Sequence, residues 1–147
     1  MNDEPVIVHV ETLDWHEVHA QRMGERRASV WNRFVDISDS RTVIYTRYDP
    51  GVVLARHWHA SDEIILVLEG SLMAGDRDCP TGSVILLDAG TRFGPIVTGD
   101  AGAVIFEVFD GPAARAGTDH EGFDALLEAR GVVELPDPPF RLPETRR

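Results

Sequence analysis

The chain has 147 residues and carries 25 acidic against 14 basic side chains, which gives a formal net charge of −11. This length fits one domain, and a hydrophobic fraction of 43% is enough for a real core, so general disorder is excluded. A surface this acidic repels phosphate backbones and anionic lipid headgroups, which makes nucleic acids and membrane surfaces poor partners.

The first part of the chain has a mixed character. The segment Val6-Ile7-Val8-His9-Val10 predicts an edge strand, while Thr12 to Gln21 fits either a helical turn or a loop. Ala28 to Ile37 again predicts an extended chain. We therefore assign residues 1–40 to an N-terminal extension that packs on the domain that follows.

Short β-rich runs follow one another from residue 41 to residue 110, and each ends at a turn signal. The main runs are 42–48, 52–59, 63–68, 83–87 and 103–109. Because runs of about five to eight residues recur without helical periodicity, they predict an antiparallel sandwich or barrel. Residues 41–110 form the predicted core of an all-β fold.

The C-terminal part, residues 111–147, predicts a short helix and a proline-rich tail. Thr118-Asp119-His120-Glu121 has the form of a capping box, and Gly131 stands where a helix end favours a left-handed residue. We predict one helix over 119–130 that covers the barrel. Beyond it, the prolines predict an extended tail that is either disordered or laid across a partner subunit.

The cellular compartment is indicated by cysteine usage and by the N-terminus. Cys79 is the sole cysteine, so no intrachain disulfide can form. The first five residues are acidic where a secretory signal would be basic, and no apolar run approaches the length of a membrane helix. These features predict a cytoplasmic, soluble protein.

Three side chains within one short stretch are candidate metal ligands. His57 and His59 point the same way if they lie on a strand, because side chains alternate with period two. A turn at 60–62 and a returning strand can bring Glu63 beside them. Two imidazoles and one carboxylate suit a divalent cation and leave coordination positions open for substrate, water or dioxygen. A His-x-His pair alone is often only an exposed strand face, but burying all three groups without a cation is costly.

Residues 51–70 resemble the first motif of the cupin superfamily, with matching intervals at Gly51, His57, His59, Glu63 and Gly70. The second motif aligns with Gly82, Asp88, Gly90 and Phe93, where Asp88 replaces the usual proline. The segment 12–15 is also similar to small cupins of the zinc anti-sigma type. The resemblance implies a small single-domain cupin with a jelly-roll-like β-barrel, a metal held by His57, His59 and Glu63, and a homodimer.

Phe93 stands where the family's remaining metal-binding histidine would be, and three interpretations follow. His57, His59 and Glu63 form a complete three-ligand site beside an apolar wall. Alternatively, a replacement ligand comes from elsewhere, namely from one of His9, His16, His19 or His120. In the third interpretation the chain binds a small molecule without a metal. Retention of all three ligands of the first motif favours the first interpretation.

Several further residues are candidates for the substrate pocket or for catalysis. Phe93, Tyr45, Ile65 and Val67 are the predicted apolar wall. Glu107 interrupts an apolar run, so it is either a general base aimed into the barrel or, as is more common, a residue on the solvated face. Tyr45 and Arg47 lie on a strand that should border the cavity, and Arg47 or Arg56 could hold a substrate carboxylate.

The favoured function is a metal-dependent enzyme that acts on a small organic molecule. Fe(II) is the favoured metal, although ligand identity also allows Mn, Ni or Zn. A dioxygenase acting on an enolisable or aromatic substrate is the leading expectation, and isomerase, cyclase or lyase chemistry could use the same ligands. The alternatives are a non-catalytic module that senses a metal or ligand, and a metal-free storage or scaffold cupin.

Overall fold

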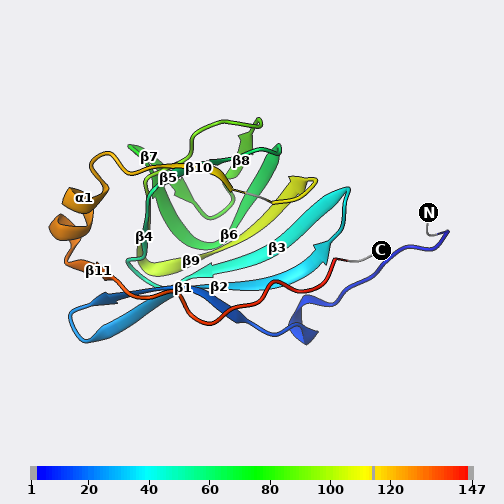
Figure 1. Ribbon diagram of the computed structural model, residues 1–147, viewed down its shortest axis with the longest axis horizontal. Helices are drawn as coiled ribbons and strands as arrows, with labels where there is room; N and C mark the ends of the chain where they lie inside the picture. Colours follow the sequence, from blue (N-terminus) through cyan, green and yellow to red (C-terminus); the bar gives the residue numbers. More distant parts are fainter. Residues whose placement is uncertain (1–2, 114, 146–147) are drawn as a thin grey trace.

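A computed structural model describes residues 3–113 and 115–145 and shows an all-β fold with a short C-terminal helix, as predicted (Figure 1). The strands are β1 (His16–Met23), β2 (Arg26–Ile37), β3 (Arg41–Tyr48), β4 (Val53–Leu54), β5 (Arg56–His59), β6 (Glu63–Ala74), β7 (Arg77–Pro80), β8 (Val84–Leu87), β9 (Ile96–Asp110), β10 (Arg115–Asp119) and β11 (Val132–Glu134). A 3-10 helix, η1 (Val10–Thr12), precedes them, and the α-helix α1 (Phe123–Arg130) lies between β10 and β11.

Two antiparallel sheets enclose the interior. The larger sheet has the order β11-β1-β2-β3-β9-β6-β7, with β4 paired to β9 and β8 paired to β6. The smaller sheet consists of β10 and β5. Figure 1 shows the larger sheet curling round, with the two-stranded sheet across its open side. The sheets are not joined into a closed barrel, but the arrangement is that of a cupin-like jelly roll.

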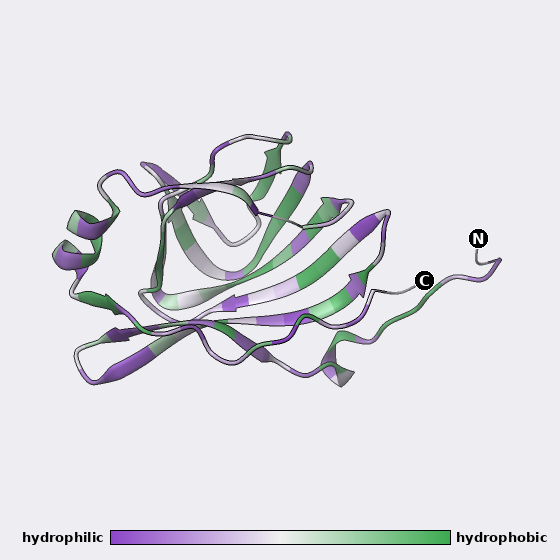
Figure 2. Cartoon of the chain, viewed as in Figure 1, coloured by the Kyte–Doolittle hydropathy of each residue, from purple (hydrophilic) through white to green (hydrophobic). Residues whose placement is uncertain are grey.

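Strict alternation along the central strands separates an inner from an outer face. On β3, Thr42, Ile44, Thr46 and Tyr48 are buried while the residues between them are partly exposed. The same alternation on β6 and β9 places Ile65 and Ile105 in the main hydrophobic core. Figure 2 shows apolar stretches along β3, β6, β8 and β9. The inner face therefore forms the core and, at one end, the walls of a cavity.

The strand β6 continues past the position at which its sequence predicts an end. Gly70 has a φ of +67°, and a Cβ atom at this position would overlap the carbonyl oxygen of Gly102 on β9. The pairing of β6 with β9 shifts register on both sides of Gly70. The glycine therefore bends one long strand against its neighbour instead of ending it, because only a residue without a side chain fits there.

Both ends of the chain differ from the prediction. Residues 6–9 are not a strand but an exposed segment that leads into η1, and the ambiguous stretch 12–21 contributes most of β1. The helix begins at Phe123 and not at residue 119, because Thr118 and Asp119 belong to β10. Its N-cap is Gly122, so the predicted capping box does not form. Gly131 ends the helix in the left-handed conformation, as predicted.

Part of the C-terminal tail is ordered and packs on its own chain, so the expectation of a disordered tail is wrong, whereas contact of the tail with a partner subunit stays a prediction. The backbone N–H of Leu135 donates a hydrogen bond of 3.1 Å to the carbonyl of Ala20 on β1. Further on, the Phe140 ring stacks on Phe34 of β2 with the ring centroids 5.4 Å apart. In the part of the chain that the structure describes, no helix is long and apolar enough to cross a membrane.

Candidate metal and substrate site

The stretch predicted as one strand over 52–59 is divided between the two sheets at Ala55. The strand β4 pairs with β9, whereas β5 pairs with β10. His57 and His59 therefore lie on the smaller sheet, opposite the inner face of the larger one. The two imidazole rings meet edge to face with centroids 5.3 Å apart, and both line the same hollow, so they point the same way as predicted.

A small hollow of about 20 Å³ lies between the sheets. His57 and His59 line it from the smaller sheet, and Glu63, Tyr48 and Glu107 line it from the larger sheet. Such a volume holds roughly one water molecule or one ion. Tyr48, His57, His59 and Glu107 also line a second cavity of about 500 Å³. An ion-sized space therefore adjoins a space large enough for a small organic molecule.

The His57 ring is held in one tautomer. Its Nδ1 atom lies 3.0 Å from the carbonyl oxygen of Ala55, and because a carbonyl only accepts, Nδ1 carries the proton. Burial lowers the pKa of His57 to about 4, so the ring is neutral at physiological pH. The lone pair is then on Nε2. In a metal-binding histidine, one ring nitrogen usually donates a hydrogen bond to a backbone carbonyl or a carboxylate, and the other nitrogen presents its lone pair to the metal.

Glu63 and Glu107 form a buried carboxyl pair. Burial, together with the neighbouring Glu107, raises the pKa of Glu63 to about 9. Burial also raises the pKa of Glu107, whose Oε2 accepts a hydrogen bond of 2.5 Å from the hydroxyl of Thr46. The two carboxyl groups thus share a proton at neutral pH in the absence of a cation. Glu107 points into the cavity, so the more common solvated position is wrong for this residue.

Tyr48 faces this carboxyl pair from β3. Burial and the charges of Glu107 and Glu63 raise its pKa well above the usual value. The phenol therefore stays neutral and can donate a hydrogen bond.

The segment that resembles the second cupin motif holds the first motif in place. His57 and Phe93 exchange two backbone hydrogen bonds, of 3.0 and 2.8 Å. The N–H of Gly90 donates to the carbonyl of His59 (2.8 Å), and the N–H of Ala89 donates to the side chain of Asp62 (2.8 Å). Phe93 lines the small hollow, which is the position predicted for the apolar wall.

The donor set fits a divalent cation in its chemistry, although the side chains are not drawn together around one point. Among residues 3–113 and 115–145, no three His, Cys, Asp or Glu side chains converge closely enough to hold a metal ion. The assignment of His57, His59 and Glu63 as ligands therefore stays a prediction. Two observations support it. The neutral His57 ring, hydrogen-bonded to the backbone, lies beside His59. The carboxyl pair of Glu63 and Glu107 holds a proton that a cation could replace.

The four histidines considered as replacement ligands lie outside the small hollow. His16 packs between Phe34 and Phe140, with ring centroids at 6.0 and 5.7 Å. His9 lies in the exposed N-terminal segment. His19 and His120 line the larger cavity but not the small hollow.

Three predicted pocket residues are placed elsewhere. Tyr45 and Arg47 lie on the outer face of β3, where Tyr45 packs against Phe106 and Arg47 lies over the Trp15 and Trp31 rings. Val67 is inward but belongs to the packed core. For β3 the prediction chose the right strand but the wrong face. Thr46 and Tyr48 line the cavity, and Tyr45 and Arg47 do not. Arg56, the other proposed carboxylate holder, lines a groove beside β7 and β8 and not this cavity.

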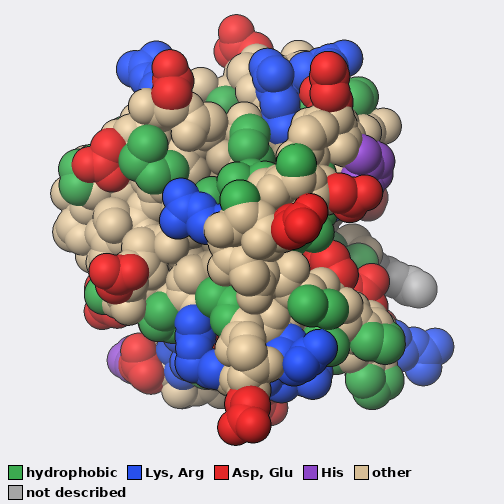
Figure 3. All heavy atoms as spheres, turned by 90° about the vertical axis from the view of Figure 1, so that its left-hand side faces the viewer, with side chains coloured by type: hydrophobic (Ala, Val, Ile, Leu, Met, Phe, Trp, Pro, Cys, Tyr) green, Lys and Arg blue, Asp and Glu red, His purple; other side chains and the backbone are tan. Residues whose placement is uncertain are grey.

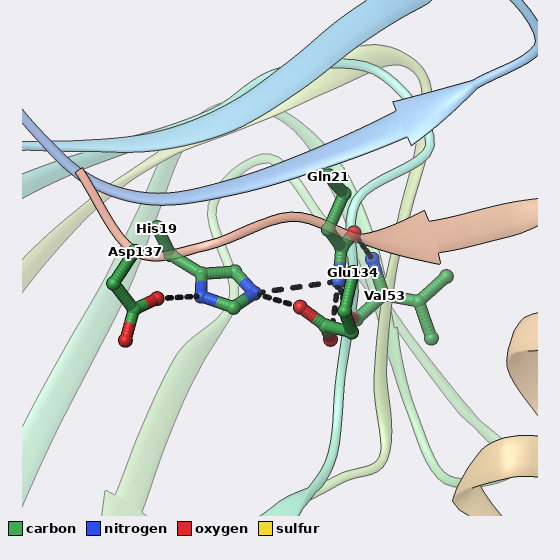
Figure 4. Close-up of polar contacts among 5 residues, drawn as sticks. All are labelled: His19, Gln21, Val53, Glu134 and Asp137. Atoms are coloured by element: carbon green, nitrogen blue, oxygen red, sulfur yellow. Dashed lines mark hydrogen bonds and ion pairs between the residues drawn. The ribbon is translucent and has the colours of Figure 1, made fainter.

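Sequence reasoning missed a cluster at the rim of the larger cavity (Figure 4). His19 lies between two carboxylates, with Nε2 2.7 Å from Glu134 and Nδ1 3.0 Å from Asp137. The buried Gln21 donates to Glu134 (2.9 Å) and exchanges two hydrogen bonds with the backbone of Val53 (2.6 and 3.1 Å). The tail therefore supplies part of the cavity wall. No local motif signals these contacts between β1 and the tail, because His19 and Asp137, and Gln21 and Glu134, are more than 100 positions apart.

Arg115 is a further residue that the sequence did not single out. It pairs with His59 across β10 and β5 and lines the larger cavity. Its charge helps to lower the pKa of His57 and opposes the rise at Tyr48, while partial burial lowers the pKa of the guanidinium itself. Arg115 is the only arginine among the described residues that line this cavity, and the chain has no lysine to supply another cation.

Comparison with known proteins gives one family and several solved structures of similar fold. The model of a family described as the ChrR cupin-like domain matches residues 3–113. No curated protein matches significantly. Similar solved structures include KdgF from Halomonas sp. (18% identity, TM-score 0.59, 74% of this chain and 96% of that one) and the polyketide cyclase RemF from Streptomyces resistomycificus (22%, 0.57, 78% and 83%). A chain from the Rhodobacter sphaeroides complex of SigE with the anti-sigma ChrR matches at 16% identity and a TM-score of 0.55, over 69% of this chain and 52% of that one.

Proposed function

Because the chain belongs to the family of ChrR cupin-like domains, we propose that it is a metal-dependent enzyme of the cupin type that acts on a small organic molecule. One observation carries this proposal: an ion-sized hollow, whose lining includes His57, His59 and the carboxyl pair of Glu63 and Glu107, adjoins a cavity of about 500 Å³. Substrate pockets typically fall between about 300 and 1,000 Å³. A storage or scaffold protein has no need of this combination.

His57, His59 and Glu63 would hold the cation, with Fe(II) favoured and Mn, Ni or Zn possible. Bound there, the metal would supply a Lewis acid with open coordination positions. Glu107 would hold or release a proton at its carboxyl group, since its pKa is raised by burial. Phe93 and Ile65, which line the same hollow, would exclude water.

The substrate proposed is an enolisable or aromatic molecule that carries an anionic group. Arg115 would bind that group, because it is the only arginine among the described residues that line the larger cavity. The leading reaction is oxygen insertion or carbon–carbon cleavage by a dioxygenase. Isomerase, cyclase and lyase reactions need the same placement of a chelating substrate and would give turnover without oxygen consumption.

The test is oxygen uptake by the Fe(II)-loaded protein over a panel of β-dicarbonyl and phenolic acids. We expect turnover that His57→Ala abolishes and that His9→Ala, a histidine in the exposed N-terminal segment, leaves unchanged. Product analysis without oxygen would detect isomerase, cyclase or lyase activity. No turnover with any metal, or equal turnover in His57→Ala, would contradict the proposal.

A second candidate is a non-catalytic module that senses a metal or ligand. The family description favours it, because a chain from a complex that contains the anti-sigma ChrR shares this fold. Tightly held stoichiometric zinc without turnover supports sensing, whereas exchangeable iron with turnover supports catalysis.

A further inference from the structure

A groove of about 650 Å³ lies where the two sheets are not joined. One wall is the edge of the larger sheet, residues 74–79 and 83–87, and the facing wall is Arg56 of β5 with residues 92–94. Neighbouring side chains on a strand point to opposite faces, yet all of residues 83–87 line the groove. The groove therefore follows the backbone edge of β8, and we call it the edge groove.

The backbone of β8 presents polar groups to the edge groove. Val67 on β6 exchanges two backbone hydrogen bonds with residues 82 and 83 (2.8 and 2.9 Å), so its N–H and carbonyl groups point toward β8. Because this direction alternates along an antiparallel pair, the groups of Ile85 point to β6, and those of Val84 and Leu86 point away from it. Among the described residues, no strand pairs with that side of β8.

The edge of β8 lacks the features that usually protect a free strand edge, namely charges, proline, a bulge or a covering segment. The strand β7 follows the same side of β6 and has two charges and a proline in Arg77-Asp78-Cys79-Pro80. By contrast, β8 reads Val84-Ile85-Leu86-Leu87, and Val84 and Leu86 are 60% and 73% exposed. An open, uncharged edge of this kind can be extended by a further strand.

The β7 end of the edge groove carries charges of both signs. Cys79 is buried, so its side chain lies on the inner face of β7. Arg77 shares that face by alternation, whereas Asp78 points to the outer face. Asp76, in the turn before β7, also lines the groove. The inward charge contributed by β7 itself is therefore the guanidinium group of Arg77.

The facing wall carries two more arginines. The Arg92 guanidinium lies over the Trp58 ring, 4.5 Å from its centroid, and 3.7 Å from Asp119. Arg56 is exposed and, like Arg77, forms no ion pair within the part of the chain that the structure describes. At the end that carries α1, Figure 3 shows acidic, basic and apolar side chains interspersed. The edge groove differs in combining two unpaired arginines with an open strand edge.

We propose that an extended acidic segment of a partner protein binds in the edge groove as an additional strand on β8. Its backbone would pair with Val84 and Leu86, and its acidic side chains would bind Arg56 and Arg77. Four residues of β8 span roughly 14 Å, so a short segment suffices. At physiological ionic strength, charges more than about 8 Å apart are largely screened, so these arginines outweigh the net charge of −11.

Other occupants satisfy only half of the edge groove. A small anion would neutralise Arg56 and Arg77 but would leave the backbone groups of Val84 and Leu86 unpaired. The β8 strand of a second copy could pair with that edge, but it is uncharged and would leave both arginines without a partner. An acidic strand provides the backbone groups and the carboxylates together.

The probe is a fluorescein-labelled synthetic peptide of eight residues that alternates glutamate and valine. Its two faces match the groove, with valines beside the exposed side chains of Val84 and Leu86 and glutamates toward the arginines. Fluorescence anisotropy with the full-length chain, in the presence of a chelator, should show saturable binding. A peptide with an N-methylated backbone, or with lysine in place of glutamate, should bind about tenfold more weakly or worse.

Leu86→Pro tests the free edge directly. Proline lacks the N–H group that faces the groove, while the hydrogen bonds to β6 come from Ile85 and Leu87, and proline is tolerated at such edge positions. We expect the dissociation constant of the peptide to rise about tenfold. Leu86→Ala keeps the N–H group and should weaken binding clearly less. Arg77→Ala should also weaken binding, whereas Arg22→Ala, on β1, should not.

Amide hydrogen exchange followed by NMR supplies a second readout on the wild type. The amides of Val84 and Leu86 should exchange rapidly in the free protein and slowly with the peptide bound. Those of Ile85 and Leu87, already bonded to β6, should be slow in both states. This measurement decides the question even if Leu86→Pro does not fold, which circular dichroism establishes.

Three results would overturn the proposal. The first is no binding of the peptide at high micromolar concentration, and the second is equal affinity in folded Leu86→Pro. The third is protection of the Val84 and Leu86 amides without peptide that grows with protein concentration, which would assign the edge to a second copy. Because the chelator keeps the protein free of metal, these results are independent of the proposed function.

Discussion

At residue scale, the buried pair of Glu63 and Glu107 makes stability depend on pH. The folded-state pKa of Glu63 is about 9 against 4.5 in the unfolded chain, so the native state holds a proton that the unfolded state loses. The free energy of unfolding should therefore fall as pH rises, by at most about 1.4 kcal/mol per pH unit and proton. His57, with its pKa lowered from 6.5 to about 4, gives the opposite slope below pH 6.5.

We therefore predict, for the metal-free protein, a loss of stability between pH 6.5 and 9 that is smaller in Glu63→Gln. Urea unfolding at a series of pH values in the presence of a chelator measures it. Glu17→Gln is the matched control, because the pKa of Glu17 is lowered by Arg27 and this carboxylate does not titrate in that window. Equal slopes in wild type and Glu63→Gln would show that the carboxyl group does not hold the proton.

A second prediction at this scale concerns the contribution of the Gln21 side chain to stability. Its side-chain amide satisfies both the N–H and the carbonyl of Val53 inside the protein, and Gln21 itself is fully buried. Gln21→Leu leaves both backbone groups unpaired, at a cost of about 1–3 kcal/mol each. Chemical denaturation should show a loss of roughly 2–6 kcal/mol, while Arg22→Leu on the exposed side of β1 should change little.

At the scale of elements, the close approach of β6 and β9 depends on a missing side chain. Gly70→Ala would bring a Cβ atom against the backbone of Gly102, and the left-handed backbone adds strain. Gly24 has a similar φ of +59°, but no atom lies within 4 Å of the place where its Cβ would stand. We expect Gly24→Ala to cost about 1–2 kcal/mol from backbone strain and Gly70→Ala clearly more. Similar unfolding free energies for the two variants would show that β6 and β9 separate at no cost.

Much of the fold was predictable from the sequence at this scale, and the failures have physical reasons. Turn residues and β-branched runs marked the strands of the core, and the histidine spacing placed His57 and His59 on one side of β5. The choice of Tyr45 over Tyr48 failed because alternation alone does not say which of two faces is inner. The strand predicted over residues 6–10 does not form, because strand propensity alone does not supply a partner strand within the chain.

The candidate site was only half predictable for a different reason. The first motif is local, so His57, His59 and Glu63 could be found from spacing. Glu107 was a candidate because it interrupts an apolar run, but its position beside Glu63 follows from the pairing of β6 with β9. Arg115 faces His59 through the pairing of β10 with β5. Strand pairing over such separations leaves no local signal in one sequence.

At the scale of the whole molecule, the net charge of −11 opposes association of two copies. Salt shortens the range of this repulsion, from about 30 Å at 0.01 M to about 8 Å at 0.15 M.

The division of one extended stretch at Ala55 has a consequence for how the molecule moves. Two of the candidate donors lie on a two-stranded sheet and the others lie on the large sheet opposite, and among the described residues no strand pairing joins the two sheets. An ion bound in that gap would act as a cross-link between the sheets. Amide hydrogen exchange along β5 and β10 should then slow when metal is added, while the central strands β3 and β9, already secured on both sides, keep their rates.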